Sequence, residues 1–95
     1  MNALLMTLRV SKPLSPELYP DIHAHLVWHK AVLVGESTFV FLSEEEPQKV
    51  YARLTRSLGE HDTMAIFTLK PPAQYFLGGE AQAKLAALLE QAYDN

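Results

Sequence analysis

The chain has 95 residues, of which 48% are hydrophobic, and carries eight lysines and arginines against eleven aspartates and glutamates. This length fits one domain, and this hydrophobic fraction argues against a disordered chain. The lack of cysteine excludes disulfides and thiolate metal sites, and a net charge of −3 with scattered basic residues argues against the basic face of a DNA-binding protein.

The apolar runs of the chain are short. None approaches the roughly 18 residues of a membrane span. The first ten residues, MNALLMTLRV, have no basic segment before an apolar core and no small-residue cleavage site after one, so we expect no signal peptide. We therefore expect a cytoplasmic location and no membrane partner.

The first predicted strand runs from Leu4 to Val10, because its residues alternate between two faces. A loop with two prolines follows. Pro20 fits the first position of a helix, where its missing N–H is not needed, and Asp21 complements the helix dipole. We predict a helix from Pro20 to Val27, followed by an extended segment from Trp28 to Val34.

The next predicted element is a β-hairpin. Two apolar runs, 31–34 and 38–42, flank the polar break 35–37. Gly35 is available for a positive φ in the turn. After the hairpin, the sequence Ser43-Glu44-Glu45-Glu46 matches a capping box and predicts the start of a helix.

That second helix extends to Leu58, and Gly59 serves as its C′ residue. A strand from Thr63 to Lys70 follows and ends at Pro71-Pro72. Residues 70–79 form a linker with a possible short edge strand, Gln74 to Leu77. The last predicted helix, 80–93, has one apolar stripe.

The predicted order is β-α-β-β-α-β, then a short strand and a helix. This order indicates one α+β domain, residues 1–95, with the ferredoxin-like fold: an antiparallel sheet with two helices on one face. Several strands are apolar on both faces, whereas a half-exposed antiparallel sheet alternates apolar with polar residues. The second face needs a cover, which is either the C-terminal helix or a second copy of the chain.

We predict a homodimer on this basis, since two-fold pairs are the commonest oligomers. The side chains expected at the interface are large and apolar and come from the last strands and the linker. They are Phe39, Phe41, Ile66, Phe67, Tyr75 and Phe76.

Three histidines and a tryptophan form the densest polar cluster along the chain: His23, His25, Trp28 and His29. His25 and His29 are four residues apart, which suits a metal if one helix carries both. Because the predicted helix ends at Val27, we expect the two side chains to be separated. We therefore predict no metal site and no cofactor.

Two further sets of polar residues are candidates for function. Converging carboxylates are needed for acid–base catalysis, and the carboxylates available are Asp21, Glu36, Glu60 and Asp62. The candidate set for an unusual catalytic site is Glu36, His61 and Asp62, although 60–62 also fits a polar connector. The basic residues with helical spacing are the nucleic-acid candidates, namely Lys49, Arg53 and Arg56.

In several of these features the chain resembles the Cas2/VapD-type small ferredoxin-like proteins, and among them the Cas2-like proteins of the SinR family. The resemblance covers about residues 5–76 and rests on Tyr19-Pro20-Asp21-Ile22, Leu26, Trp28-His29, Ser37-Thr38-Phe39, the helix with Val50, Leu54 and Leu58, and Asp62 before a strand.

The resemblance implies a homodimer of two stacked sheets, with a C-terminal strand pairing across the interface, and a setting in CRISPR adaptation, toxin–antitoxin systems or mobile elements. Some members are nucleases that use an aspartate at the end of the first strand. This chain has Arg9, Ser11 and Lys12 there. We therefore carry over no catalytic residue and expect a non-catalytic antitoxin, scaffold or regulator with a protein or nucleic-acid partner.

Two alternatives remain. One is a metal-dependent nuclease with an unusual acidic site. The other is a small-ligand-binding module with a cleft between helices and sheet, because one fold serves many functions.

Overall fold

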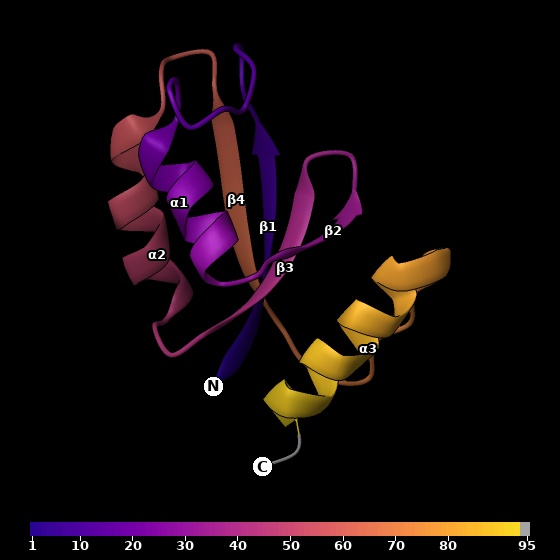
Figure 1. Ribbon diagram of the computed structural model, residues 1–95. Helices are drawn as coiled ribbons and strands as arrows, with labels where there is room; N and C mark the ends of the chain where they lie inside the picture. The colour runs from indigo at the N-terminus through magenta and orange to yellow at the C-terminus, as the bar shows by residue number, and fades with distance from the viewer. Residues whose placement is uncertain (94–95) are drawn as a thin grey trace.

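The computed structural model describes residues 1–93 and contains one four-stranded antiparallel sheet and three α-helices (Figure 1). In chain order the elements are β1 (Asn2–Arg9), α1 (Pro20–Trp28), β2 (Val32–Gly35), β3 (Thr38–Ser43), α2 (Pro47–Leu54), a 3₁₀ turn η1 (Thr55–Ser57), β4 (Thr63–Leu69) and α3 (Gly79–Tyr93).

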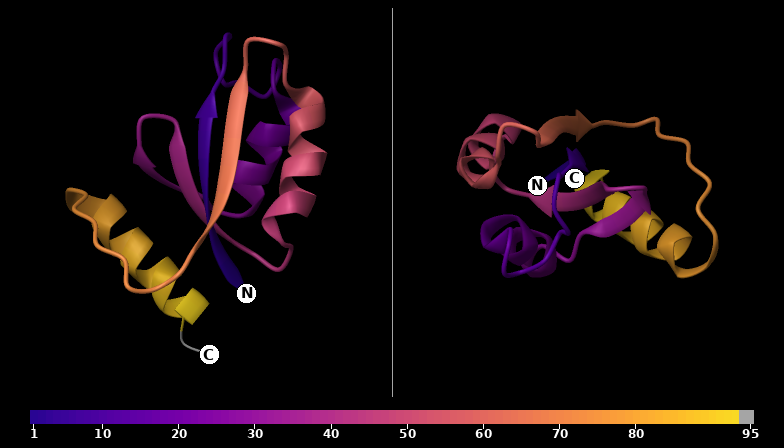
Figure 2. Two further views of the ribbon diagram at one scale, coloured as in Figure 1. Left: turned by 180° about the vertical axis from the view of Figure 1, so that it is seen from behind. Right: turned by 90° about the horizontal axis from the view of Figure 1, so that it is seen from above.

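The strands lie in the order β2-β3-β1-β4, and each neighbouring pair is antiparallel. This is the ferredoxin-like arrangement, so the predicted α+β fold is confirmed. Helices α1 and α2 lie side by side on one face of the sheet, and α3 lies apart from them, reached by a long connector from β4 (Figures 1 and 2).

The face under α1 and α2, here called the first face, holds a closed core. The alternation expected in β1 places Leu4, Met6 and Leu8 on this face, where they are buried. The two helices close it with one apolar stripe each, and the ring of Phe41 lies fully buried between the layers. The helix residues concerned are Ile22, Val50 and Leu54. This core contains the largest fully buried side chains of the described residues.

The opposite face, here called the second face, is covered in part by α3. Leu85, Leu88 and Leu89 of this helix pack against Ala3, Val32 and Val40. The C-terminal helix of the chain itself is thus one cover of the second face. It does not extend over the whole of β4, where the Phe67 side chain stays 56% exposed.

The expected capping box at Ser43 was wrong. Ser43 is the last residue of β3 and is buried, and its hydroxyl accepts the Glu45 N–H at 3.0 Å. The serine hydroxyl thus stabilises the turn that follows β3 and does not cap a helix. Helix α2 begins later, at Pro47, with Glu46 at the N-cap position and no side-chain cap. The motif misleads because serine makes the same backbone contact in turns and in caps.

Helix boundaries differ elsewhere too. Helix α1 continues through Trp28, one residue beyond the expected end. Helix α2 ends at Leu54 and passes into η1, so Gly59 is not its C′ residue. Instead, the Gly59 N–H donates to the Asp62 carboxylate at 2.8 Å.

The hairpin turn and the linker also depart from expectation. The positive φ in the β2–β3 turn belongs to Ser37, at 51°, and not to Gly35. Residues 74–77 form no strand but run as an irregular connector, with Tyr75 and Leu77 packed against the α3 cluster. Because α3 lies on the second face, this connector lies against α3 and pairs with no strand edge.

Candidate functional site

Asp62, a candidate catalytic residue, is a hydrogen-bonding centre. Its Oδ1 accepts the Ser11 N–H at 2.7 Å and the Ser11 hydroxyl at 3.0 Å. Its Oδ2 accepts the Gly59 N–H at 2.8 Å and the Tyr19 hydroxyl at 3.2 Å. The backbone N–H groups of Gly59 and Ser11 are the main reason that the pKa of Asp62 falls to about 2. The carboxylate therefore ties the loop after β1 to the start of β4.

The other two catalytic candidates lie elsewhere. Glu36 is exposed in the β2–β3 turn, and His61 is exposed with its Nε2 3.3 Å from the Glu60 carboxylate. Within residues 1–93, no hydrogen bond or ion pair joins Glu36, His61 and Asp62, and no three histidine or acidic side chains are grouped so as to hold a metal ion.

His25 and His29, in contrast, lie together. Their ring centroids are 4.2 Å apart, with an angle of 33° between the planes. The expected separation was wrong because α1 continues to Trp28 and His29 is its C-cap, with its N–H bonded to the His25 carbonyl at 3.0 Å. One extra helical residue is enough to keep two side chains at this spacing on the same side.

His25 is the buried member of this pair. Its ring meets Phe41 edge to face at 4.7 Å, and its Nδ1 lies 3.4 Å from the Arg53 guanidinium. Burial first, and then the neighbouring His29 and Arg53, lower the pKa of His25 to about 4, while Glu45 opposes the shift. The imidazole is therefore neutral at pH 7. Its Nε2 has no hydrogen-bond partner among the described residues.

A cleft of about 430 Å³ opens between α1 and α2 beside this pair. Arg53, which lines the cleft, bridges both oxygens of Glu45, at 2.8 and 2.9 Å. Arg56 and Trp28 also line it, whereas Lys49 is exposed on α2 and does not. Of the three nucleic-acid candidates, the structure brings together Arg53 and Arg56.

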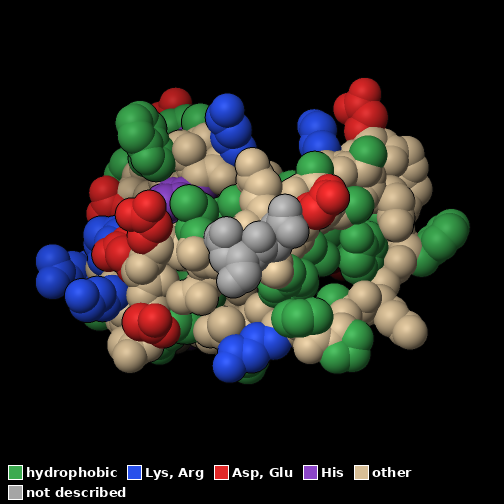
Figure 3. All heavy atoms as spheres, turned by 90° about the horizontal axis from the view of Figure 1, so that it is seen from below, with side chains coloured by type: hydrophobic (Ala, Val, Ile, Leu, Met, Phe, Trp, Pro, Cys, Tyr) green, Lys and Arg blue, Asp and Glu red, His purple; other side chains and the backbone are tan. Residues whose placement is uncertain are grey.

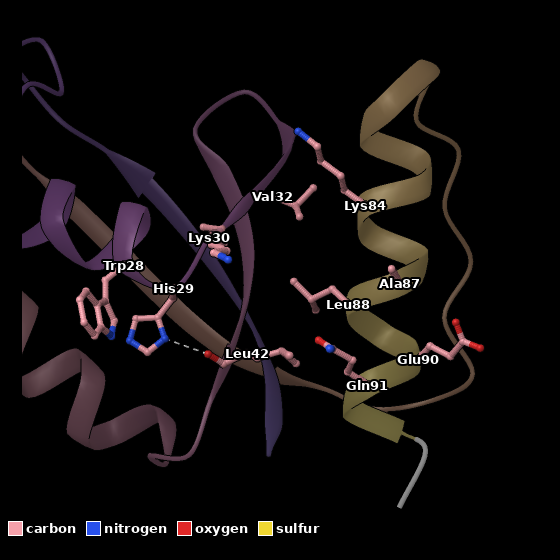
Figure 4. Close-up of a pocket in the computed structure, with 11 residues that line it drawn as sticks. Trp28, His29, Lys30, Val32, Leu42, Lys84, Ala87, Leu88, Glu90 and Gln91 are labelled. Atoms are coloured by element: carbon pink, nitrogen blue, oxygen red, sulfur yellow. Dashed lines mark hydrogen bonds between the residues drawn. The ribbon is translucent and has the colours of Figure 1, made fainter.

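A larger groove of about 980 Å³ lies on the other side of Trp28, between the start of β2 and α3 (Figure 4). Lys30 and Val32 form one wall, and Lys84 and Leu88 form the other. Figure 3 shows the surface hollowed there, with basic side chains on both sides of the notch. Trp28 and His29 line both hollows, and His29 Nδ1 donates to the Leu42 carbonyl at 3.0 Å, shown dashed in Figure 4.

The residues expected at a dimer interface divide into two groups. Phe41 is fully buried in the first-face core, and Phe39 and Ile66 are partly buried against it. Tyr75 packs against the α3 cluster. Only Phe67 and Phe76 are largely exposed, at 56% and 94%. These two are the members of the set that offer a partner substantial surface.

Sequence reasoning did not connect Lys30 and Lys84 with Trp28. Lys30 is two residues from Trp28 but lies in the turn after α1, and Lys84 lies far along the chain in α3, so no spacing rule relates the three. Trp28 carried a local signal, since it stands beside the histidines. Only the packing of α3 against β2 places the second basic wall next to it.

No family model, curated protein or solved structure matches this chain. Among the helices of residues 1–93, none combines the length and the apolar character that a bilayer crossing requires.

Proposed function

We propose that this chain is a non-catalytic interaction protein that acts as a homodimer, paired through the free edge of β4. The observation that carries this proposal is the edge itself. Strand β4 ends the sheet order, and its seven residues, TMAIFTL, include no charge, proline or glycine. Natural proteins usually protect such an edge, because its unpaired N–H and C=O groups accept another strand.

The opposite edge of the sheet is different. Strand β2 has four residues, and α3 packs against its Val32. The β4 edge is therefore the longer and more open of the two.

The sequence of β4 is complementary to itself about a two-fold axis at Ile66. In that antiparallel register Phe67 of one subunit lies opposite Ala65 of the other, on the second face, so a large ring is beside a small methyl group. At each end of the paired strands, Lys70 lies opposite Asp62 of the other subunit. The Phe67–Ala65 pairs, and not these end charges, favour this register over shifted ones, because the Asp62 carboxylate is already bonded by Ser11 and Gly59 of its own subunit.

The resemblance to Cas2/VapD-type proteins also supports a dimer and a role as antitoxin, scaffold or regulator. The stacked-sheet dimer that it implies needs a C-terminal strand and an open second face. Here residues 74–77 form a connector and α3 covers part of that face. We therefore place the contact at the β4 edge.

The register gives a specific test by sedimentation equilibrium. Phe67→Glu and Ala65→Lys should each convert a wild-type dimer into a monomer, because each places a charge beside an apolar side chain. The double variant should dimerise again, because the introduced lysine of one subunit then faces the introduced glutamate of the other. Tyr51→Glu, at an exposed aromatic on α2, is the matched control and should stay dimeric. A monomeric wild-type chain, or a double variant that stays monomeric, would contradict the proposal.

A further inference from the structure

Trp28 stands between two hollows that together contain half of the basic side chains of the protein. Arg53 and Arg56 line the cleft on one side, and Lys30 and Lys84 line the groove on the other. We infer that this surface, here called the Trp28 surface, binds a short stretch of single-stranded nucleic acid. A base stacks on the indole, and the flanking phosphates contact the basic walls.

The indole is placed for stacking. Its side chain is 83% exposed at the last position of α1. The adjacent His29 is held by its bond to Leu42 and by its ring contacts with His25 and Phe41. The backbone beneath Trp28 is therefore fixed while the ring faces solvent. An aromatic side chain presented in this way accepts any base, because every base has a π face.

The charges on the two walls favour a polyanion. Arg56 has no ion pair or hydrogen bond within residues 1–93, and Lys84 has only a loose contact of 3.9 Å with Glu80. Asp21 is the one acidic side chain among the described residues that line the cleft, and its Oδ2 accepts the Ser57 hydroxyl at 3.1 Å. Glu90 also lines the groove, and Figure 4 shows its carboxylate on the side of α3 away from Trp28. Arg53 is already paired with Glu45, so Arg56, Lys30 and Lys84 are the basic groups left to meet phosphates.

A single strand fits better than a duplex or an acidic peptide. A duplex keeps its base faces stacked and cannot offer one to the indole. An acidic peptide would pair with the basic side chains but would offer the exposed indole no planar group to stack on. The three basic groups that remain when Arg53 is paired with Glu45, set against a net charge of −3, predict moderate affinity with a clear dependence on salt.

The test is fluorescence anisotropy with a labelled short oligothymidylate and the intact chain. Trp28→Ala should weaken binding roughly 5- to 150-fold, the range measured for loss of one stacked base, and Trp28→Phe should restore most of it. Arg56→Ala and Lys84→Ala should each weaken binding and lower the slope of log K against log salt by about 0.7, between roughly 50 and 200 mM salt. Lys49→Ala is the matched control, since it removes an exposed charge of α2 outside both hollows.

Three outcomes would overturn the inference. The first is no binding of the oligonucleotide by the wild-type chain. The second is equal affinity for an abasic oligonucleotide, which would leave the indole without a role. The third is stronger binding of polyglutamate than of the oligonucleotide, which would assign the surface to an acidic peptide. Circular dichroism of each variant separates lost binding from lost folding.

This inference goes beyond the proposed dimer and does not require it. The groove lies next to β2, at the opposite edge of the sheet from β4, and the cleft lies between α1 and α2 on the first face, whereas Phe67 of β4 is on the second face. The Phe67→Glu variant should therefore bind the oligonucleotide with unchanged affinity per subunit. Measurements on the same set of variants therefore distinguish failure of the proposed dimer from failure of the proposed oligonucleotide binding.

Discussion

The two faces of the sheet are built in different ways. On the first face, α1 and α2 are crossover helices between strands of the sheet, and the side chains between the layers are almost completely buried. On the second face, α3 follows the last strand through residues 70–78 and covers only part of the surface. The first face therefore holds the fold together, whereas the second face and the edges provide surfaces for partners.

The largest effect expected is the loss of Phe41 from the first face. Phe41→Ala should lower the free energy of unfolding by about 3–5 kcal/mol, because a fully buried ring leaves a cavity in a closed layer. Leu88→Ala, on the second face, should cost about 2 kcal/mol, because α3 covers this face only in part and can move to fill the space. Urea unfolding of both variants measures the difference. Equal losses would show that the two faces are equally rigid.

The second prediction concerns pH and again tests the first face, where His25 is buried against Phe41. The pKa of His25 is about 4 in the folded chain against 6.5 ordinarily, so the unfolded chain binds more protons between these values. Stability is therefore complete above about pH 6.5 and falls as the pH is lowered towards 4. The full change is at most roughly 3.5 kcal/mol, at about 1.4 kcal/mol for each pKa unit.

Urea titrations at a series of pH values between 7 and 4 measure this change. This pH range separates the effect of His25 from that of Asp62, because the contribution of Asp62 to the free energy of unfolding is lost only as the pH falls from 3.8 towards 2. In His25→Leu the dependence between pH 6.5 and 4 should be nearly flat. A wild-type chain with constant stability over this range would show that the imidazole can be protonated without leaving the core.

The closed face is also the part that the sequence predicts best. Alternation in β1 and the i, i+4 spacing in α1 and α2 specify which side chains are buried, because these periods are local. The capping motif at Ser43 could not be resolved locally, since a strand end and a helix start use the same serine contact. The pairing of His25 with His29 depended on a single residue at the end of α1.

The candidate surfaces were harder to predict. Apolar residues on both faces of the strands indicated that something packs on the second face. They did not indicate what packs there, because α3 and a second subunit would both bury the same apolar side chains. The Trp28 surface combines residues of α1, the turn before β2, α2, η1 and α3. Such a combination follows from tertiary packing, to which no single stretch of sequence contributes a recognisable motif.

The smallest effect expected concerns Tyr19, whose ring is buried in the first-face core while its hydroxyl reaches Asp62 at 3.2 Å. Tyr19→Phe removes only the hydroxyl and should cost about 1 kcal/mol, the usual value for one hydrogen bond. Asp62 retains its bonds from Ser11 and Gly59, so the loop after β1 should stay in place. Tyr19→Ala is the comparison, because it also removes the ring and should approach the loss seen for Phe41→Ala. If Tyr19→Phe proved as damaging as Tyr19→Ala, the hydroxyl bond to Asp62, and not the packing of the ring, would hold this end of the first face closed.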